Sequence, residues 1–596
     1  MRKTIKRLGA VLLAMAMAVS VLCTGALAAE TTYTLTINDT NKNHKYTAYQ
    51  VFAGTVDESK KLSVTGWGDG VNLTSAPTEG TYSGKTLVQA VQAITVDSKT
   101  PFAGKTEPGD IAAVLGDTAN NRKDSPVAAA FADVVANYLK GEGNPTGEWT
   151  DVSGNTPAHY SITGLTGGYY FVKSANTAST DVANTRYMLE VVGDATVAAK
   201  NGVPTVDKTV QNANNTNTDF ADTTTAQVGQ TVNFKLTGTL PSNYDYYKSY
   251  EYIFHDTLSK GLTLTDAQKA ALFVKVYASQ DEATRDKDGS SDAVGAKLAA
   301  DKYTVNVTPN SDANTTSLKV AFADLKTIKK ADNTEALITK DSVIVVYYSA
   351  TINGSATAGG EGNKNSVKLE YSNDPNNTGT GITKSDEVSV FTFKLDITKI
   401  KKNDAKTKLA GAKFVLSTSA NLKIDVTESD ANLSADVKND LIKVTGTTPD
   451  YVINDGTTTS ANEQYIMETG NDTNLGQLNI TGLNKGVYYL YETKAPDGYN
   501  RITEPIKIAI TEATTTEKDA AGKFSVKTLQ YKINDGDEQN GTTTDGVIKA
   551  DVENTSGSTL PSTGGMGTKL FYTIGGILMA GAAIVLVVRK RRSDAE

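Results

Sequence analysis

The segment FTFKLDITK, Phe391–Lys399, alternates between two faces with the two-residue period of a β-strand. One of these faces is apolar until its last position, where a lysine follows: Phe391, Phe393, Leu395, Ile397 and Lys399. A lysine is unusual in an inward-facing row, because burial disfavours the charged form of an amine. The segment therefore predicts a core strand that carries a buried lysine. Lys401 has the same parity and is the alternative candidate.

Two later segments bring further polar groups into apolar strands. YLYETKAPDGY, Tyr489–Tyr499, contains Glu492, and VIKADVEN, Val547–Asn554, ends with Asn554. Together with FTFKLDITK, these segments resemble the Cna B-type domain of Gram-positive surface proteins and pilins. The resemblance implies an intramolecular isopeptide bond between Lys399 and Asn554, with Glu492 as the proton relay.

The physical chemistry of buried groups is consistent with this role. Burial favours the neutral forms of Lys399 and Glu492, and a neutral amine is a nucleophile whereas an ammonium is not. A protonated Glu492 can donate to the carbonyl oxygen of Asn554 and then pass a proton to the departing ammonia. The simpler interpretation is a Lys–Glu ion pair beside an uninvolved asparagine. The order of the three motifs favours the bond.

Internal similarity suggests the domain boundaries. ITGLTGGYYFVKSA, Ile162–Ala175, is similar to ITGLNKGVYYLYETKAP, Ile480–Pro496, because both combine a turn, a glycine, a tyrosine pair and an alternating strand. Each copy lies near the end of a domain, and we place the limits of these two domains at 29–203 and 394–556. The region 204–393 has alternating strands separated by turn residues, as in a β-sandwich. We expect a mainly β chain of tandem immunoglobulin-like, Cna-type β-sandwich domains.

The N-terminal domain differs from the C-terminal one at a decisive position. Where the later copy has Glu492, the earlier copy offers Val172 and Lys173, so the acid is missing. We therefore expect no isopeptide bond in this domain. Apolar residues at helical spacing predict helices at 84–94 and 125–140.

The middle domain contains a second set of lysine, acid and asparagine. PTVDKTV carries Lys208 and FHDTLSKGL carries Asp256, while NSVKLEYSNDP carries both Asn365 and Asn373. The arrangement resembles the second domain of sortase-assembled pilins, which is similar to the Cna A-type fold. The resemblance implies that Asp256 is the proton relay and that the bond joins Lys208 to an asparagine. Asn365 opens the strand and is preferred, but Asn373 shares its face and is the alternative, although it also suits a turn before Asp-Pro.

The C-terminal end carries a motif for cell-wall attachment. It begins with the pentapeptide Leu560, Pro561, Ser562, Thr563 and Gly564. An apolar run at 570–588 follows, which is about long enough to cross a bilayer as a helix, and then a basic cluster typical of the cytoplasmic side. Residues 557–596 resemble the LPXTG cell-wall sorting signal of Gram-positive surface proteins. The resemblance implies that a sortase cleaves between Thr563 and Gly564 and transfers the acyl group to an amine.

The N-terminal end predicts export. Residues 1–28 combine a basic start, an apolar core and the small residues around Ala28 that precede cleavage, as in a secretory signal peptide. The one cysteine, Cys23, lies inside this signal. We therefore expect a secreted mature protein that has no disulfide bond to stabilise it.

One further lysine concerns polymerisation. VAAKN, Val197–Asn201, resembles the pilin motif of pilus backbone subunits, although Ala198-Ala199 replace the usual Tyr-Pro. The resemblance implies that Lys200 attacks the acyl-sortase that holds Thr563 of another subunit. The alternative is an ordinary linker lysine. The sortase substrate role requires Lys200 to be exposed, unlike Lys208.

Composition excludes several classes of function. The chain has 59 Lys and Arg against 67 Asp and Glu, a net charge of −8, so nucleic acid is not an expected partner. The three histidines are widely spaced and form no metal-binding pattern. No phosphate loop, nucleophile elbow or dinucleotide fingerprint is present. We expect no metal, no cofactor and no enzymatic activity, since the bonds described above are self-modifications.

These observations favour the shaft subunit of a covalent pilus (fimbria) on the Gram-positive cell wall, which supports adhesion. The expected partners are pilus-specific and housekeeping sortases, other copies of the chain and peptidoglycan, with minor pilins and host surface ligands as further candidates. Contact with the membrane is expected only before sorting. The alternative is a monomeric LPXTG-anchored surface adhesin, which would have the same signal and anchor but no functional Lys200.

Overall fold

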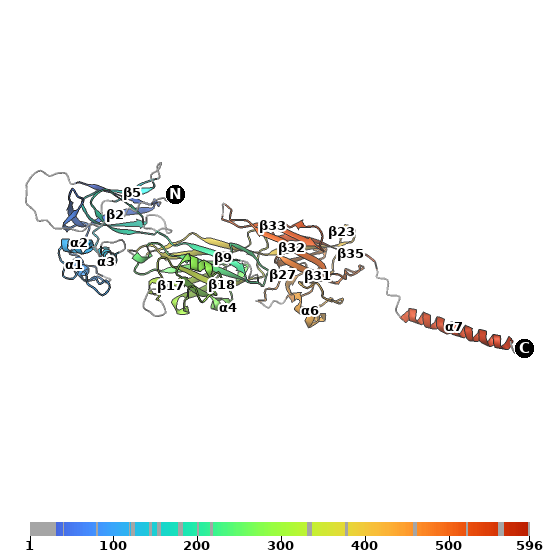
Figure 1. Ribbon diagram of the computed structural model, residues 1–596. Coiled ribbons are helices and arrows are strands. Elements are labelled where there is room, and N and C mark those ends of the chain that lie inside the picture. The colour runs from blue at the N-terminus through green and yellow to red at the C-terminus, as the bar shows by residue number, and fades with distance from the viewer. Residues whose placement is uncertain are drawn as a thin grey trace, which may run out of the picture.

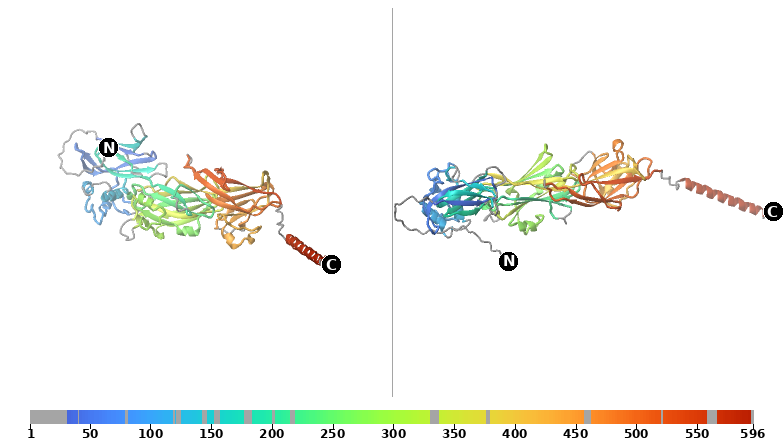
Figure 2. Two further views of the ribbon diagram at one scale, coloured as in Figure 1. Left: turned by 45° about the vertical axis from the view of Figure 1, so that its right-hand side comes forward. Right: turned by 90° about the horizontal axis from the view of Figure 1, so that it is seen from above.

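The computed structural model describes residues 31–593, apart from 40, 79–80, 118–119, 121–124, 142–145, 152–156, 177–182, 200–201, 215–218, 330–336, 376–378, 457–461, 520–521 and 558–565. Three β-rich domains lie in a row (Figure 1, Figure 2), which confirms the mainly β fold and its tandem organisation. The signal peptide at 1–28, the LPSTG segment and Lys200 lie outside the described residues.

Two four-stranded sheets form the N-terminal domain. Their strands are β1 (Tyr33–Asn38), β2 (His44–Val56), β3 (Leu62–Trp67), β4 (Glu148–Thr150), β5 (His159–Leu165), β6 (Gly168–Asn176), β7 (Arg186–Val191) and β8 (Ala195–Ala198). The strand orders are β4-β5-β1-β8 and β3-β2-β6-β7. Strand β1 thus lies inside its sheet and pairs in parallel with β8, which precedes the segment that contains Lys200.

The described part of this domain also contains the helices α1 (Leu87–Gln92), α2 (Pro108–Gly116) and α3 (Pro126–Val135). The helices predicted at 84–94 and 125–140 are confirmed as α1 and α3, whereas α2 was not predicted. Helix α3 begins where the Ser125 side chain accepts a hydrogen bond from the backbone of Ala128, a standard N-terminal cap. It ends at Val135, before the expected limit, and the next amides bond three residues back, Asn137 to Val134 and Tyr138 to Val135, so the chain leaves the helix in a tighter turn.

The middle domain is a sandwich of a six-stranded and a seven-stranded sheet. Its elements are β9 (Val206–Asn212), β10 (Thr223–Thr225), β11 (Thr231–Thr239), β12 (Tyr252–Ser259), β13 (Leu262–Thr263), α4 (Asp266–Ala271), β14 (Phe273–Tyr277), α5 (Gln280–Arg285), β15 (Ala296–Lys297), β16 (Thr304–Asn310), β17 (Thr315–Phe322), β18 (Val343–Ile352), β19 (Asn363–Ser372), β20 (Thr380–Ile382) and β21 (Asp386–Phe391). One sheet has the order β15-β14-β18-β11-β9, with β13 beside β18; the other has the order β10-β21-β19-β12-β17-β16, with β20 beside β19.

The C-terminal domain consists of two seven-stranded sheets. Its elements are β22 (Phe393–Lys401), β23 (Asp404–Lys408), β24 (Lys413–Ser417), α6 (Ala435–Asn439), β25 (Leu441–Ile442), β26 (Val444–Thr447), β27 (Asp450–Ile453), β28 (Glu463–Gln464), β29 (Met467–Glu468), β30 (Gln477–Leu483), β31 (Gly486–Lys494), β32 (Ile506–Thr515), β33 (Val526–Ile533), β34 (Gln539–Asn540) and β35 (Val547–Asn554). The first strand β22 pairs with the last strand β35 in parallel, while β31 belongs to the other sheet.

A continuous apolar core joins the middle and C-terminal domains. At this junction the backbone N–H of Val228 donates to the carbonyl of Gly482 at 2.9 Å. Lys518 of the C-terminal domain also forms an ion pair with Asp386 of the middle domain, at 2.6 Å. Burial of apolar surface and satisfied backbone groups hold these two domains against each other.

Helix α7 (Met566–Ser593) follows the C-terminal domain. Residues 572–592 are long and apolar enough to cross a membrane, and they are not buried against the rest of the chain. The helix includes the apolar run at 570–588, for which the sequence predicted a membrane-spanning helix.

Candidate functional site

The C-terminal domain brings Lys399, Glu492 and Asn554 together in its core. Lys399 lies on β22 and Asn554 at the end of the neighbouring strand β35, while Glu492 reaches them from β31. The Lys399 Nζ lies 3.2 Å from Glu492 Oε1, and neither side chain is exposed. The Asn554 Nδ2 donates to Glu492 Oε2 at 3.0 Å. One carboxyl group therefore contacts both the amine and the amide nitrogen.

Burial shifts the ionisation equilibrium of the Lys399 amine. It lowers the pKa of Lys399 to about 8, although the nearby Glu492 acts in the opposite direction. The Lys399 amine also lies over the Phe414 ring, 5.6 Å from its centroid. Among the described residues, Asn554 Oδ1 is buried and accepts no hydrogen bond; the Glu492 carboxyl contacts the amide nitrogen and not this oxygen, to which we expected it to donate. The cluster can thus supply a nucleophilic amine beside an unengaged amide carbonyl.

The alternative lysine lies in a different environment. Lys401 is only half-buried, although it has the same parity as Lys399 along β22. The pairing of β22 with β23 is irregular between Ile400 and Lys401, and Lys399 and Ile400 are both buried. The irregularity breaks the simple alternation that made the two lysines equivalent in the sequence.

The middle domain forms a comparable cluster between its two sheets. Lys208 on β9 donates to Asp256 Oδ2 on β12 at 2.6 Å, and both side chains are fully buried. Asn365 on β19 lies in the same cluster, where its Nδ2 donates to the hydroxyl of Tyr348 at 2.5 Å. The Tyr348 hydroxyl in turn donates to Asp256 Oδ2 at 2.6 Å. Burial lowers the pKa of Lys208 to about 8, against the opposing effect of Asp256.

The register of β19 separates the two candidate asparagines. Asp256 pairs with Val367, so Asn365 lies two residues from the level of the acid. Asn373 follows the other end of β19 and, at roughly 3.3 Å per residue, lies about 20 Å from that level. Its backbone carbonyl accepts a hydrogen bond from Asn184 of the N-terminal domain at 2.6 Å. The structure thus brings Asn365, and not Asn373, into the Lys208 cluster.

Tyr348 is the site residue that sequence reasoning missed. It lies on β18, a strand that is buried on both faces along almost its whole length. A strand of this kind shows no alternation between apolar and polar residues, so the sequence VIVVYYSATI does not reveal which tyrosine faces the acid. The sequence offered only one indication that a tyrosine of this strand belongs to the site: a buried tyrosine hydroxyl needs a polar partner.

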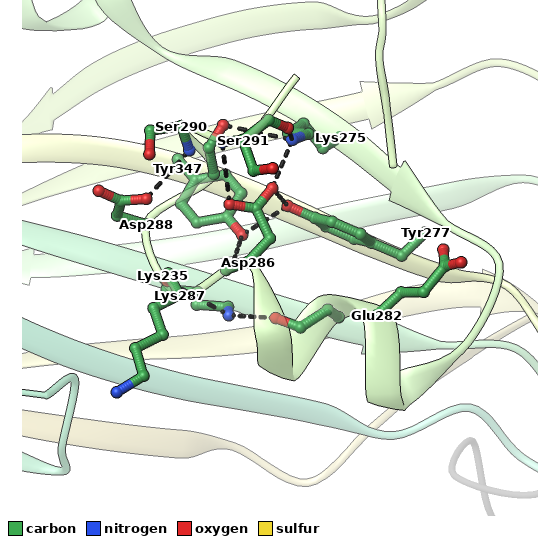
Figure 3. A network of polar contacts seen from close by, with 12 residues as sticks. Lys235, Lys275, Tyr277, Glu282, Asp286, Lys287, Asp288, Ser290, Ser291 and Tyr347 are labelled. Carbon is green, nitrogen blue, oxygen red and sulfur yellow. Dashed lines mark hydrogen bonds and ion pairs between the residues drawn. The ribbon is translucent and has the colours of Figure 1, made fainter. Parts of the chain in front are cut away.

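Besides Lys208 and Asp256, the middle domain has another buried lysine–acid pair, and this pair has no asparagine beside it (Figure 3). Lys275 forms an ion pair with Asp286 and also donates to the carbonyl of Ser291 at 2.7 Å. The Tyr277 hydroxyl donates to Asp286 Oδ2 at 2.8 Å, and the Tyr347 hydroxyl lies 2.9 Å from that of Tyr277. In this described network no carboxamide contacts the amine, so we interpret it as a structural ion pair.

The N-terminal domain has apolar packing where the later copy has its acid. Val172 on β6 is fully buried, and the Lys173 amine lies over the Tyr49 ring at 5.3 Å from its centroid. This domain also has a buried pair of ionisable side chains, Asp39 and His44, whose Oδ2 and Nδ1 atoms lie 2.6 Å apart. The absence of an isopeptide bond from this domain stays a prediction.

No metal site is evident in the part of the chain that the structure describes. His44 contacts Asp39, His255 contacts Glu370 at 2.7 Å, and His159 contacts a backbone carbonyl. Within the described ranges, no three His, Cys, Asp or Glu side chains are grouped closely enough to hold a metal ion.

Comparisons with known proteins relate two segments of the chain to described families. Residues 396–524 match the SpaA prealbumin-like fold domain, and residues 552–595 match the LPXTG cell wall anchor motif. The chain is 27% identical over 431 residues to the trypsin-resistant surface T6 protein of Streptococcus pyogenes, an alignment that covers 67% of this chain and 71% of that protein.

Solved pilin structures are also similar to this chain. The T6 backbone pilin of serotype M6 Streptococcus pyogenes is 16% identical with a TM-score of 0.46, covering 89% of this chain and 100% of that one. The full-length major pilin SpaD from Corynebacterium diphtheriae is 14% identical with a TM-score of 0.42, covering 89% and 99%. The chain thus carries a cell wall anchor motif and is similar in sequence to a streptococcal surface protein.

Proposed function

We propose that the protein is the shaft subunit of a covalent Gram-positive pilus that is anchored to the cell wall. The alignment with a surface protein over 67% of the chain, in a sequence that ends in an LPXTG anchor, carries this proposal. Three domains in a row suit a subunit that is joined end to end with its copies (Figure 2). The role is structural and not enzymatic.

In this proposal each of the last two domains closes its own isopeptide bond. In the C-terminal domain the Lys399 amine attacks Cγ of Asn554, and Glu492 moves a proton from the amine to the departing ammonia. Its carboxyl oxygens lie 3.2 Å from Lys399 Nζ and 3.0 Å from Asn554 Nδ2, which supports a relay without large movement. The low pKa of Lys399 raises the fraction of nucleophilic amine.

The middle domain is proposed to use Lys208, Asp256 and Asn365 in the same way. The contact between Asp256 and Lys208 supports proton transfer from the amine, and burial excludes water from the reacting groups. Asn365 is the proposed acceptor because its amide nitrogen donates to the Tyr348 hydroxyl, which also contacts Lys208 and Asp256.

Polymerisation is proposed to join Lys200 of one subunit to Thr563 of the next. A pilus-specific sortase would hold Thr563 as an acyl-enzyme, and the Lys200 amine would displace the enzyme to form an amide. A housekeeping sortase would instead transfer the terminal subunit to peptidoglycan. Minor pilins and host surface ligands are further proposed partners of the assembled shaft.

An immunoblot of wall extracts tests this function. The unaltered strain should give a ladder of high-mass bands, whereas Lys200→Ala should give only the wall-attached monomer, because its LPSTG signal is intact. Lys200→Arg should not restore the ladder, since a guanidinium stays protonated and cannot act as the nucleophile. Lys99→Ala, at an exposed lysine of the same domain, is the matched control and should keep the ladder.

Two results would contradict the proposal in different ways. A ladder in Lys200→Ala cells would mean that another lysine polymerises the chain. A single band from the unaltered strain, with its pilus sortase present, would favour a monomeric anchored adhesin.

A further inference from the structure

The Tyr348 hydroxyl lies at the centre of the middle-domain cluster and contacts all three of the groups proposed to react. It donates to Asp256 Oδ2 at 2.6 Å and accepts from Asn365 Nδ2 at 2.5 Å and from Lys208 Nζ at 3.3 Å. The ring is held in place by stacking on Phe234, with centroids 5.1 Å apart. The hydroxyl is therefore fixed among the amine, the acid and the amide nitrogen.

The two domains differ in how their acids reach the leaving group. In the C-terminal domain the Glu492 carboxyl contacts Asn554 Nδ2 directly, at 3.0 Å. Asp256 has one methylene fewer, and the hydrogen bond of Asn365 Nδ2 goes to Tyr348 and not to the acid. The tyrosine oxygen thus spans the gap that the shorter side chain leaves.

We propose that the Tyr348 hydroxyl is a catalytic proton carrier between Asp256 and the leaving nitrogen of Asn365, a role that rests on the isopeptide bond proposed above. The neutral Lys208 amine bonds to Cγ of Asn365, and the carbonyl electron pair moves to Oδ1. Asp256, as the carboxylic acid, gives its proton to the Tyr348 oxygen while Tyr348 gives its own proton to Nδ2. The resulting carboxylate takes a proton from Nζ, the Cγ–Nδ2 bond breaks, and ammonia leaves as the carbonyl re-forms.

The protons and atoms balance over this sequence. An amine and a carboxamide become a secondary amide and ammonia, and both Asp256 and Tyr348 return to their starting forms. The planar amide Nδ2 is a donor before the reaction, but in the tetrahedral intermediate it gains a lone pair and becomes an acceptor. The short contact to Tyr348 can therefore reverse its direction without movement of either side chain.

The environment of Tyr348 favours a relay over ionisation. Burial raises the pKa of this tyrosine well above its ordinary value, and the neighbouring Asp256 acts in the same direction. A free phenolate is therefore disfavoured. The hydroxyl can still accept one proton while it donates another, because the two transfers together leave no net charge on the oxygen.

Tyr348→Phe in the full chain tests the proposal, because it removes only the hydroxyl and keeps the stacked ring. We expect the Lys208–Asn365 branched peptide to form about 10²-fold more slowly or not at all in the folded, protease-resistant fraction. The branch in the C-terminal domain should form normally. Tyr347→Phe is the matched control, since this adjacent buried tyrosine serves the Lys275–Asp286 network (Figure 3) and should leave both branches intact.

The outcomes distinguish this proposal from the one on which it rests. A wild-type chain without the middle-domain branch would refute the bond itself. A wild-type chain with the branch, together with a Tyr348→Phe chain that forms it equally fast, would overturn the role of the hydroxyl alone.

A second measurement needs no variant. Cell-free synthesis of the wild-type chain in D₂O should slow the middle-domain bond by a larger factor than the C-terminal bond, because the relay moves two protons together. Equal slowing of the two bonds would overturn the relay.

Discussion

Replacing Glu492 by glutamine should prevent the C-terminal isopeptide bond while the domain still folds. Glutamine has nearly the same shape, and its carbonyl oxygen can keep the bond that Glu492 Oε2 accepts from the backbone of Ile502 at 2.7 Å. It cannot carry a proton from the Lys399 amine to the amide nitrogen of Asn554. The amine and the amide should therefore remain separate groups.

The loop-entropy model for crosslinks gives the expected loss of stability. A bond from residue 399 to residue 554 closes a loop of about 155 residues, which corresponds to about 5 kcal/mol at 25 °C. An unfolding entropy of about 2.1 cal/mol/K per residue gives roughly 0.34 kcal/mol/K for a domain of about 160 residues. The Tm of the C-terminal domain should therefore fall by about 15 °C.

Intact mass and calorimetry of the full chain check both parts of this prediction. The Glu492→Gln protein should lack one of the two ammonia losses of the wild type, and its C-terminal transition should shift as calculated. Asn554→Ala is the control, because it removes the acceptor but keeps the acid beside Lys399. The assignment of the relay is wrong if Glu492→Gln still loses both ammonia molecules. The crosslink does not stabilise the domain as reasoned if the bond is absent and Tm is unchanged.

Three further predictions follow from the two clusters. The wild-type mature chain should weigh less than its sequence by two ammonia molecules in intact-mass measurement, and a mass equal to the sequence would exclude both bonds. Peptide mapping should find a branch that joins Lys208 to Asn365; a branch at Asn373 would keep the bond but refute the choice of acceptor. In the Asn554→Ala variant Lys399 stays unreacted, and its pKa is near 8 in the folded state against 10.5 when unfolded, so the unfolded state binds more protons between these values. Its free energy of unfolding should therefore rise with pH from about 8 to about 10.5 in denaturant titrations, and a flat or falling profile would mean that the lysine is not desolvated.

The sequence was most informative where a strand has one buried face. The period of two in FTFKLDITK indicated that Lys399 points inward, and VIKADVEN corresponds to β35 without a shift at either end. The mainly β fold and helices α1 and α3 followed from similar periodicities. These features depend on local patterns, which a single sequence contains in full.

Other features depend on pairing between distant segments, and local patterns do not contain this information. Asn365 on β19 and Asn373 just after its end are an even number of residues apart, so they look equivalent in the sequence, and only the register of β19 against β12 separates them. Lys399 and Lys401 fall on the same face in a regular strand, but the pairing of β22 with β23 is irregular between Ile400 and Lys401. No residue type in the sequence indicates this irregularity. Tyr348 was missed because β18 is buried on both faces, so its side chains show no alternation from which to choose a face.

The parallel pairing of β22 with β35 has a mechanical consequence for a chain that is pulled at both ends. Tension would enter β22 at its N-terminal end, from the middle domain, and leave β35 at its C-terminal end, toward the anchor. Two parallel strands pulled in this way are sheared, so the hydrogen bonds between them resist together and do not open one after another. A covalent link between Lys399 and Asn554 would carry the tension directly from one strand to the other. The residues between these two positions would then bear no force, and they could vary in sequence or bind other molecules without weakening the chain under tension.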